Sequence, residues 1–363
     1  MANVRLLFMS LSQVAAFGLL AACGGDSELS DGGTSSDLSA AADGGATVDL
    51  SKSSAPDASR AEQTVLIAGG QDLRHVVSFD GMTFGHDTYV AANGLDNAFG
   101  LILVGNHIVV AAGDAGIYTT TDALTWTSRG KPVGVASMHG VTGTFANGRF
   151  VLVAKESTLS STDGITWTVT NDLATSSEHW HGMAYGNGHW VAIGDNLRKV
   201  SDDGATWHDF APTPVNLNAI AFGNGVFVAT ASGDTDAGAG SVGYTITSTN
   251  GVTWTAPVYT LTSYGTGLAG IAYGQGKFVT GDCCNVFTST DGSAWTKKGT
   301  GFGGGGIVFS GVGFVAVSWR TNISVSTDGE SFTHAWSDDG PNLFDAAAQA
   351  PWLTSVGAGV LYP

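Results

Sequence analysis

The sequence predicts an all-β fold, a seven-bladed β-propeller built from four-stranded blades. Three observations predict it: a short Asp-containing motif that recurs seven times, a two-strand pattern ahead of most copies, and 53 glycines in 363 residues. Abundant glycine is typical of chains with many tight turns. A repeat of roughly 40 residues is typical of propeller blades, each of which contributes one small sheet.

The recurring motif contains a hydroxyl residue, an acid or amide two positions later, a glycine, a threonine and an aromatic residue, as in STDGITW from Ser161. The carboxylate can accept hydrogen bonds from turn amides, and the glycine can adopt a positive φ. One copy has Ala123 in place of glycine, so we expect an adjusted turn there. One copy has an amide, which favours a structural role over acid–base catalysis. The third positions are Asp80, Asp122, Asp163, Asp203, Asn250, Asp291 and Asp328.

A second pattern places two apolar runs on either side of a glycine turn, as in HGMAYGNGHWVAIGD from His181. The turn there is Asn187-Gly188, a strong hairpin signal between such runs. One unit therefore reads as strands A and B, a loop, strand C, the Asp motif and strand D. This order places the A–B turns and the Asp motifs on one face of the ring. The B–C and D–A loops then share the other face, where we expect ligands to bind.

The two ends of the chain predict how the ring closes. The first unit, from Thr64, lacks a strand A. The last residues, WLTSVGAGVLYP from Trp352, read as a strand A, its turn and part of a strand B. We therefore expect the C-terminal strand to complete the first blade, which would remove an exposed sheet edge.

The first 63 residues have a different composition from the rest. An apolar run from Leu6 to Leu20 is too short for a comfortable membrane span and fits a secretion signal. It ends in LAAC, which resembles the lipobox of bacterial lipoproteins. The resemblance implies a signal peptide over residues 1–22, a lipid on Cys23 and an exported protein anchored in the cell envelope, with the outer membrane favoured. The alternative is an ordinary signal peptide with a chance cysteine. Residues 23–63 are rich in Gly, Ser, Ala and acids, and we expect a disordered tether.

The motif of the folded part, residues 64–363, resembles the Asp-box or BNR repeat of sialidase-like propellers, sortilin-type receptors and photosystem II assembly factors. The resemblance covers nearly all of that part, and it implies that each Asp motif forms the turn between strands C and D. It also implies that the aromatic residue packs between blades. Such a repeat is specific for the fold and carries no assignment of function.

Four tryptophans remain once the motif and strand B positions are assigned, and all map to B–C or D–A connections or to their edges: Trp180, Trp319, Trp336 and Trp352. Left-over aromatics favour a platform for a sugar or a peptide, the alternative being that they cap blade ends. The candidate ligand-binding residues on this face are Trp180, His181, His139, Trp319, Arg320, Trp336, Asp195 and Asp282.

A metal site is one interpretation of the histidines on this face, because His139 and the pair His179 and His181 precede strands A of neighbouring blades. They offer no compact ligand spacing with Asp195, so hydrogen-bonded structural histidines are the favoured interpretation. We expect no cofactor, although Asp234 and Asp236 faintly resemble a calcium loop.

Two adjacent cysteines, Cys283 and Cys284, follow a strand B. In an oxidising envelope they favour a vicinal disulfide, and two thiols or a soft-metal site are the alternatives.

Charge and composition narrow the function. A formal net charge of −17 argues against nonspecific nucleic-acid binding. Sialidases use an arginine triad and an Arg-Ile-Pro element, and this chain lacks that element and has few arginines. We therefore expect a noncatalytic binding or assembly scaffold for a protein, a peptide or an envelope glycan. The alternative is a glycoside hydrolase or lyase that uses acids such as Asp195 and Asp282.

Overall fold

The structure of the chain is a computed structural model, and its described residues all lie within Ser54–Pro363. The predicted signal peptide, Cys23 and residues 24–62 of the predicted tether lie outside the described residues, whereas Gln63, the last predicted tether residue, begins the first strand. The structure describes residues 63–70, 74–84, 86–89, 100–170, 179–195, 198–209, 216–234, 241–261, 268–282, 284–300, 305–317, 322–337 and 353–361.

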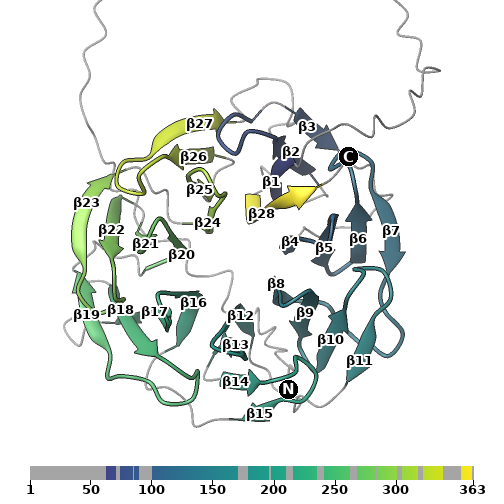
Figure 1. The fold of residues 1–363 in the computed structure, drawn as a ribbon, viewed down its shortest axis with the longest axis horizontal. Coiled ribbons are helices and arrows are strands. Elements are labelled where there is room, and N and C mark those ends of the chain that lie inside the picture. The colour runs from purple at the N-terminus through teal and green to yellow at the C-terminus, as the bar shows by residue number, and fades with distance from the viewer. Residues whose placement is uncertain are drawn as a thin grey trace, which may run out of the picture. The chain divides into compact units, whose positions relative to one another are not determined.

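These described residues form β-strands and turns and contain no helix. Consequently, this part of the chain has no helix of the length and apolarity needed to cross a membrane. The strands form seven four-stranded sheets, which Figure 1 shows arranged side by side in a ring. We number them as blades in ring order: I (β28, β1, β2, β3), II (β4–β7), III (β8–β11), IV (β12–β15), V (β16–β19), VI (β20–β23) and VII (β24–β27).

Each blade has a strand A nearest the centre and a strand D at the rim (Figure 1). The A strands are β28 (Leu353–Leu361), β4 (Leu101–Gly105), β8 (Thr142–Ala146), β12 (Trp180–Gly186), β16 (Leu217–Gly223), β20 (Ile271–Gly274) and β24 (Ile307–Phe309). The B strands are β1 (Gln63–Gly70), β5 (Ile108–Gly113), β9 (Arg149–Ala154), β13 (His189–Gly194), β17 (Val226–Asp234), β21 (Lys277–Gly281) and β25 (Phe314–Val317).

The two outer strands of each blade follow in the same order. The C strands are β2 (Arg74–Ser78), β6 (Gly116–Thr120), β10 (Ser157–Ser161), β14 (Arg198–Ser201), β18 (Ser241–Ser248), β22 (Asn285–Ser289) and β26 (Asn322–Ser326). The D strands are β3 (His86–Tyr89), β7 (Thr127–Gly130), β11 (Thr168–Thr170), β15 (His208–Asp209), β19 (Val258–Leu261), β23 (Thr296–Thr300) and β27 (Thr333–Ser337). Strands B and C bury most of their described side chains, whereas strands D are mostly exposed.

The ring closes through the C-terminal strand, as predicted. Strand β28 pairs antiparallel with β1, with Leu361 opposite Gln63 and Leu353 opposite Gly70. One detail of the prediction is wrong, because residues 353–361 form one continuous strand A instead of a strand, a turn and part of a strand B. The nine-residue strand β28 thereby takes the edge of β1 that the first unit cannot fill itself.

Neighbouring blades meet through an aromatic ring laid on a glycine. In blades IV and V, a Cβ added to Gly186 would lie 2.1 Å from the ring of Phe222. Phe222 also contacts Phe227 of strand B in its own blade, with ring centroids 4.8 Å apart. Glycine is therefore required where the inner strands approach each other, because any side chain would displace the ring. The same contact joins Gly105 to Phe145, Gly223 to Tyr273, and Gly274 to Phe309.

In six of the seven Asp motifs, the motif glycine packs on the preceding blade. Gly251 of blade V has φ +73°, and a Cβ there would lie 2.3 Å from Cγ2 of Val191 in blade IV. The glycine thus satisfies two demands at once, a left-handed backbone and a close contact between blades. Equivalent glycines are Gly81, Gly164, Gly204, Gly292 and Gly329.

In several blades, a side-chain amide in the A–B turn donates hydrogen bonds to the next blade. Asn187 of blade IV adopts φ +49° and donates from Nδ2 to the carbonyl oxygens of Gly225 (3.0 Å) and Thr249 (2.9 Å) in blade V. Asparagine suits this position because it tolerates the left-handed conformation and carries two amide hydrogens. The corresponding donors are Asn106, Asn224 and Gln275, which bond to the carbonyl oxygens of Thr162, Thr290 and Thr327.

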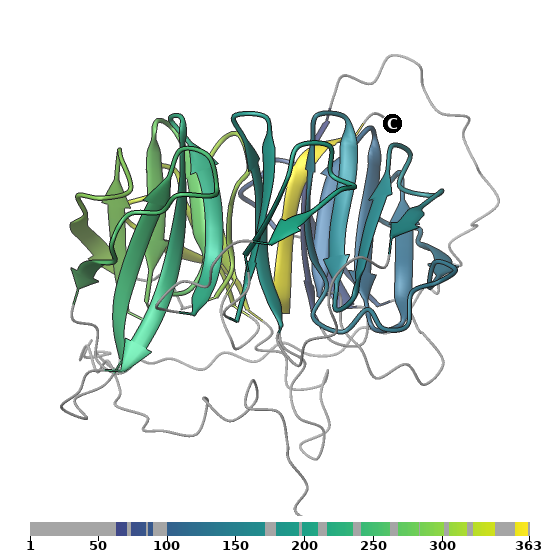
Figure 2. The same cartoon turned by 90° about the horizontal axis from the view of Figure 1, so that it is seen from below.

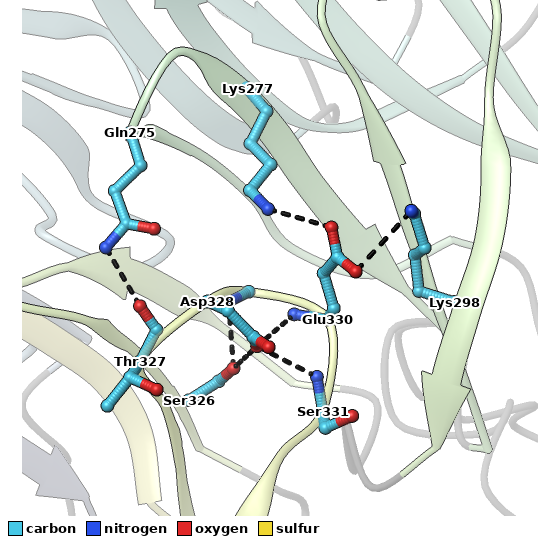
Figure 3. A network of polar contacts seen from close by, with 9 residues as sticks. Gln275, Lys277, Lys298, Ser326, Thr327, Asp328, Glu330 and Ser331 are labelled. Atoms are coloured by element: carbon cyan, nitrogen blue, oxygen red, sulfur yellow. Dashed lines mark hydrogen bonds and ion pairs between the residues drawn. The ribbon is translucent and has the colours of Figure 1, made fainter.

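Blades VI and VII add an ionic contact beside this bond (Figure 3). The Glu330 carboxylate, two residues after Asp328, lies 3.0 Å from Nζ of Lys277 and 3.4 Å from Nζ of Lys298. The hydrogen bond from Lys277, followed by the charges of both lysines, lowers the pKa of Glu330 below its usual value. The two lysines belong to blade VI, so the carboxylate fastens blade VII to blade VI.

We predict that Gly251→Ala destabilises the protein by about 3 kcal/mol or more, because it combines a left-handed backbone with overpacking against Val191. Gly188→Ala is the matched control: Gly188 has φ +87°, but an added Cβ would meet nothing within 4 Å. We expect it to cost only about 1–2 kcal/mol. Denaturant unfolding of both variants measures the difference, and equal losses would contradict the packing argument.

Candidate functional site

The ring has two faces with different chemistry. Figure 2 shows the strands running from one face to the other, with turns and loops at their ends. The hydrogen bond from Asn187 to Thr249 places A–B turns and Asp motifs on the same side, as predicted. We call this side the Asp-motif face. The opposite side carries the B–C and D–A connections, and we call it the loop face.

Each Asp motif is a closed hydrogen-bonded turn. Asp163 accepts through Oδ1 from the backbone N–H of Thr166 (2.7 Å), the N–H of Ile165 (2.8 Å) and the Ser161 hydroxyl (2.9 Å). The Ser161 hydroxyl oxygen accepts in turn from the N–H of Gly164 (2.8 Å). Asn250 makes the equivalent bonds through its amide oxygen to Val252 and Thr253. The motif therefore needs an acceptor at this position and does not need a charge.

These bonds also explain the titration of the motif acids. The backbone N–H three residues on is the largest cause, and it lowers the pKa of Asp163, Asp203 and Asp291 to about 2. Hydrogen bonds to the charged form stabilise that form. A carboxylate that stays ionised and fully engaged in its own turn is poorly suited to acid–base catalysis near neutral pH.

The expectation of an adjusted turn at Ala123 is wrong. Ala123 takes φ +62°, close to the motif glycines, and is fully buried against blade I. Asp122 still accepts from the N–H groups of Leu124 (2.9 Å) and Thr125 (2.7 Å). The turn is kept, and alanine adopts a backbone conformation that is unfavourable for it.

The motif tryptophans lie between blades, as the family resemblance implies. Trp126 of blade II donates from Nε1 to Nε2 of the buried His75 in blade I (2.9 Å). Trp295 of blade VI donates to the Thr245 hydroxyl of blade V (3.1 Å). These aromatics are thus committed to the ring.

The loop face carries a row of acids and histidines across three blades. In blades II and III, His139 Nδ1 lies 3.2 Å from Asp114 Oδ2. His139 then packs edge-on against His179 of blade IV, with ring centroids 6.0 Å apart and an interplanar angle of 73°. Two side chains that precede separate A strands are thereby brought into contact, as the sequence allowed.

The row continues within blade IV through Asp195. Its Oδ2 accepts from the backbone N–H of His179 (3.2 Å) and lies 3.3 Å from Nδ1 of the same residue. Its Oδ1 lies 3.2 Å from Nε2 of His181. Nδ1 of His181 reaches the carbonyl oxygen of Leu217 in blade V at 2.6 Å. We call the five side chains Asp114, His139, His179, Asp195 and His181 the His–Asp row.

The row is partly open to solvent. The side chain of His139 is 61% exposed, and the others are 28–31% exposed. Carboxylates and carbonyl oxygens only accept, so the ring nitrogens that face them must carry hydrogen. This orients the rings of His139 and His179 and leaves their Nε2 atoms without a hydrogen-bond partner among the described residues.

The prediction that Trp180 is an aromatic platform is wrong. Its side chain is 5% exposed and packs with Val151, Trp190 and Trp207. Its Nε1 donates to the carbonyl oxygen of Lys155 in blade III (3.2 Å). Trp180 therefore takes the alternative role named above, packing beneath the loops, and it also bonds blade IV to blade III.

Asp282 lies apart from the His–Asp row, in blade VI, and is fully buried. Its Oδ1 accepts from the backbone N–H groups of Cys284 (2.8 Å) and Asn285 (2.7 Å), and its Oδ2 from the Asn285 side chain (2.9 Å). This carboxylate therefore closes a B–C turn, and ligand binding by Asp282 stays a prediction.

The remaining candidates are described in part or not at all. Cys284 is half-buried, whereas Cys283 lies outside the described residues, so the disulfide stays a prediction. Asp234 and Trp336 lie in strands β17 and β27, where the structure describes their backbones and not their side chains. Trp319, Arg320, Trp352 and Asp236 lie outside the described residues.

Within the described part of the chain, no group of three or more His, Cys, Asp or Glu side chains is arranged to hold a metal ion. In the His–Asp row the carboxylates engage the histidines' ring nitrogens, so the row is a hydrogen-bonded set of side chains. The arrangement can donate and accept hydrogen bonds and can carry positive or negative charge on one rigid surface.

Sequence reasoning missed Asp114, yet the repeat contains a signal for it. Asp114, Asp195, Asp234 and Asp282 each follow a glycine at the end of a strand B or within its last residues. Two of the four, Asp114 and Asp195, have a histidine from a D–A connection beside them. Aligning the units at this Gly-Asp pair would have singled out both acids.

The sheets, their order and the closing strand define a β-propeller of four-stranded blades. No family model matches the chain, and no curated protein matches it either.

Solved structures do match, at low identity. A chain of the mitotic checkpoint complex has a TM-score of 0.51 at 10% identity, over 68% of this chain and 81% of that one. YCF48 bound to D1 peptide gives 0.49 at 14% identity, over 63% and 75%. The Pan2 WD40 domain of Neurospora crassa gives 0.49 at 8% identity, over 80% and 87%. Similarity at these identities concerns the fold alone.

The Asp motifs predict a specific loss of stability in acid. An Asp with a lowered folded-state pKa contributes stability that is present above about pH 5 and is lost as the pH falls toward 2. Asp163→Asn keeps the acceptor oxygen, as Asn250 shows, but cannot titrate. We therefore expect the free energy of unfolding of this variant to fall less than that of the wild type between pH 6 and pH 2.5. Parallel pH curves for the two proteins would count against the assignment.

Trp180 and His139 should differ in their effect on stability. Trp180→Ala removes a buried ring and an inter-blade hydrogen bond, and we expect a loss of about 3–5 kcal/mol. His139→Ala removes a largely exposed side chain and should change stability by less than about 1 kcal/mol. Thermal and denaturant unfolding measure both, and a mild Trp180→Ala variant would show that this side chain is not part of the core.

Proposed function

We propose that this chain is an exported, seven-bladed propeller of the Asp-box class that acts as a noncatalytic binding or assembly scaffold. In this proposal its loop face binds a protein, a peptide or an envelope glycan. Cys23, in LAAC, carries the lipid that anchors the protein in the cell envelope, with the outer membrane favoured, and residues 24–62 form the tether that leads to β1.

The observation that carries the proposal is the contrast between the two faces. On the Asp-motif face, the motif carboxylates each accept hydrogen bonds from their own turn. On the loop face, the His–Asp row is partly exposed and keeps ring nitrogens available. Four of its members lie in or directly beside strands of blades II and IV, and His139 lies in the connection before β8 of blade III, so the sheets fix the spacing of most of the row. Polar groups fixed in this way favour recognition, because binding then orders few side chains.

The alternative glycan-active enzyme requires two acids that act on one bond. Asp195 and Asp282, the pair named from the sequence, belong to blades IV and VI, with blade V between them. Asp282 is buried and both its oxygens accept hydrogen bonds within its own turn. Retaining and inverting glycosidases need two carboxyls flanking a single glycosidic bond. This contrast supports the binding proposal over hydrolysis by that pair.

Matched acid–histidine pairs on the two faces allow a direct test. Asp114→Asn with His139→Gln alters the loop face. His189→Gln with Asp202→Asn alters a pair on the Asp-motif face whose His189 Nδ1 and Asp202 Oδ1 lie 2.5 Å apart. The full chain would be immobilised and exposed to detergent-solubilised envelope extract and, separately, to a glycan array.

We expect a ligand retained by the wild type to be lost or weakened at least tenfold in the loop-face variant, and to be unchanged in the Asp-motif variant. Retention that depends on the Asp-motif pair instead would contradict the proposal. Turnover of an array glycan that is lost with Asp195→Asn would support the enzyme alternative.

A further inference from the structure

We infer that His139 and His179 form a two-histidine binding site for a borderline divalent cation such as Zn²⁺ or Cu²⁺. The ligand atoms are their Nε2 nitrogens. The site does not depend on the proposed partner binding, because it uses only side chains of this chain and solvent.

The ring nitrogen that does not bind the metal is fixed in both histidines. A histidine that binds a metal usually donates its other ring N–H to a carboxylate or a carbonyl oxygen, which fixes the tautomer. Both rings have this feature: His139 Nδ1 lies 3.2 Å from Asp114, and His179 Nδ1 lies 3.3 Å from Asp195. With hydrogen fixed on Nδ1, each neutral ring presents Nε2 with its lone pair.

The distance between the two rings is close to the distance that a shared ion requires. Metal–imidazole bonds are about 2.0–2.1 Å, so two rings that bind one ion at a tetrahedral angle have centroids roughly 5 Å apart. The observed centroid distance is 6.0 Å. An approach of about 1 Å is therefore required. His139 can supply it because its side chain is 61% exposed.

The ligand type and the nearby charges indicate which cation the site would bind. Imidazole suits Zn²⁺, Cu²⁺ and Ni²⁺ better than Mg²⁺ or Ca²⁺, which prefer oxygen. The carboxylates of Asp114 and Asp195 lie directly behind the rings, where their charge favours a bound cation. Since no group of three or more such side chains among the described residues is arranged to hold a metal ion, solvent fills the other coordination positions. We therefore expect weaker binding than at a closed four-ligand site.

Calorimetric titration of the purified full chain with ZnCl₂ tests the site. We expect an affinity for one Zn²⁺ that falls at least tenfold in His139→Ala and in His179→Ala, because each removes one of two protein ligands. The double variant should bind no more tightly than either single variant, because it has neither protein ligand. Asp195→Asn should weaken binding less than loss of either histidine does.

His189→Gln is the matched control, because His189 also pairs with an acid but has no second histidine beside it in the described structure. It should leave Zn²⁺ affinity unchanged, and circular dichroism should confirm that every variant is folded. Metal must compete with protons for the imidazoles, so affinity should fall on acidification from pH 7.5 to pH 5.5. Absence of Zn²⁺ binding, or binding that survives in both His139→Ala and His179→Ala, would overturn the inference.

Discussion

The contact between the A–B turn of one blade and the Asp-motif turn of the next is the interaction on which the ring depends. A small sheet of four strands cannot bury both of its faces alone, so each blade is stable only against its neighbours. Asn187 shows how the contact works: its amide reaches two carbonyl oxygens of blade V, while Gly251 of that blade packs on Val191. A turn that is rigid because Asp or Asn fastens it presents those groups at a fixed place.

Because of this constraint, the two faces of the ring have different roles. Because the Asp-motif face is used for turn formation and blade contacts, its polar groups are largely committed. The connections on the loop face can differ without disturbing the ring, and their sequences do differ from blade to blade. Asp195 illustrates the difference, since it accepts from His179 and faces His181, whereas Asp282 at the equivalent end of a strand B closes a turn. The same Gly-Asp pair thus serves two purposes according to its neighbours.

The repeat made much of the fold predictable from the sequence. Asn-Gly turns, motif spacing and the missing first strand were enough for strand order and ring closure, because these features are local and recur. Burial on the loop face needed a closer alignment of the units. Trp180 occupies the position that Leu217 and Leu268 hold in the next two blades, and both leucines are buried. Aligning the units at strand A would therefore have indicated that Trp180 packs inside, beside Trp190 and Trp207. The contact of His139 with His179 depends on how two blades approach, which no single unit encodes.

In this account the loop face binds the ligand, whereas the Asp-motif face holds neighbouring blades together. Hydrogen–deuterium exchange of the full chain, with and without a ligand that it retains, tests this most directly. We predict slower exchange within residues 131–140 and 179–186, with unchanged exchange in the Asp-motif turns at 161–167 and 248–254. Protection centred on those turns, with the loop-face segments unaffected, would contradict the account.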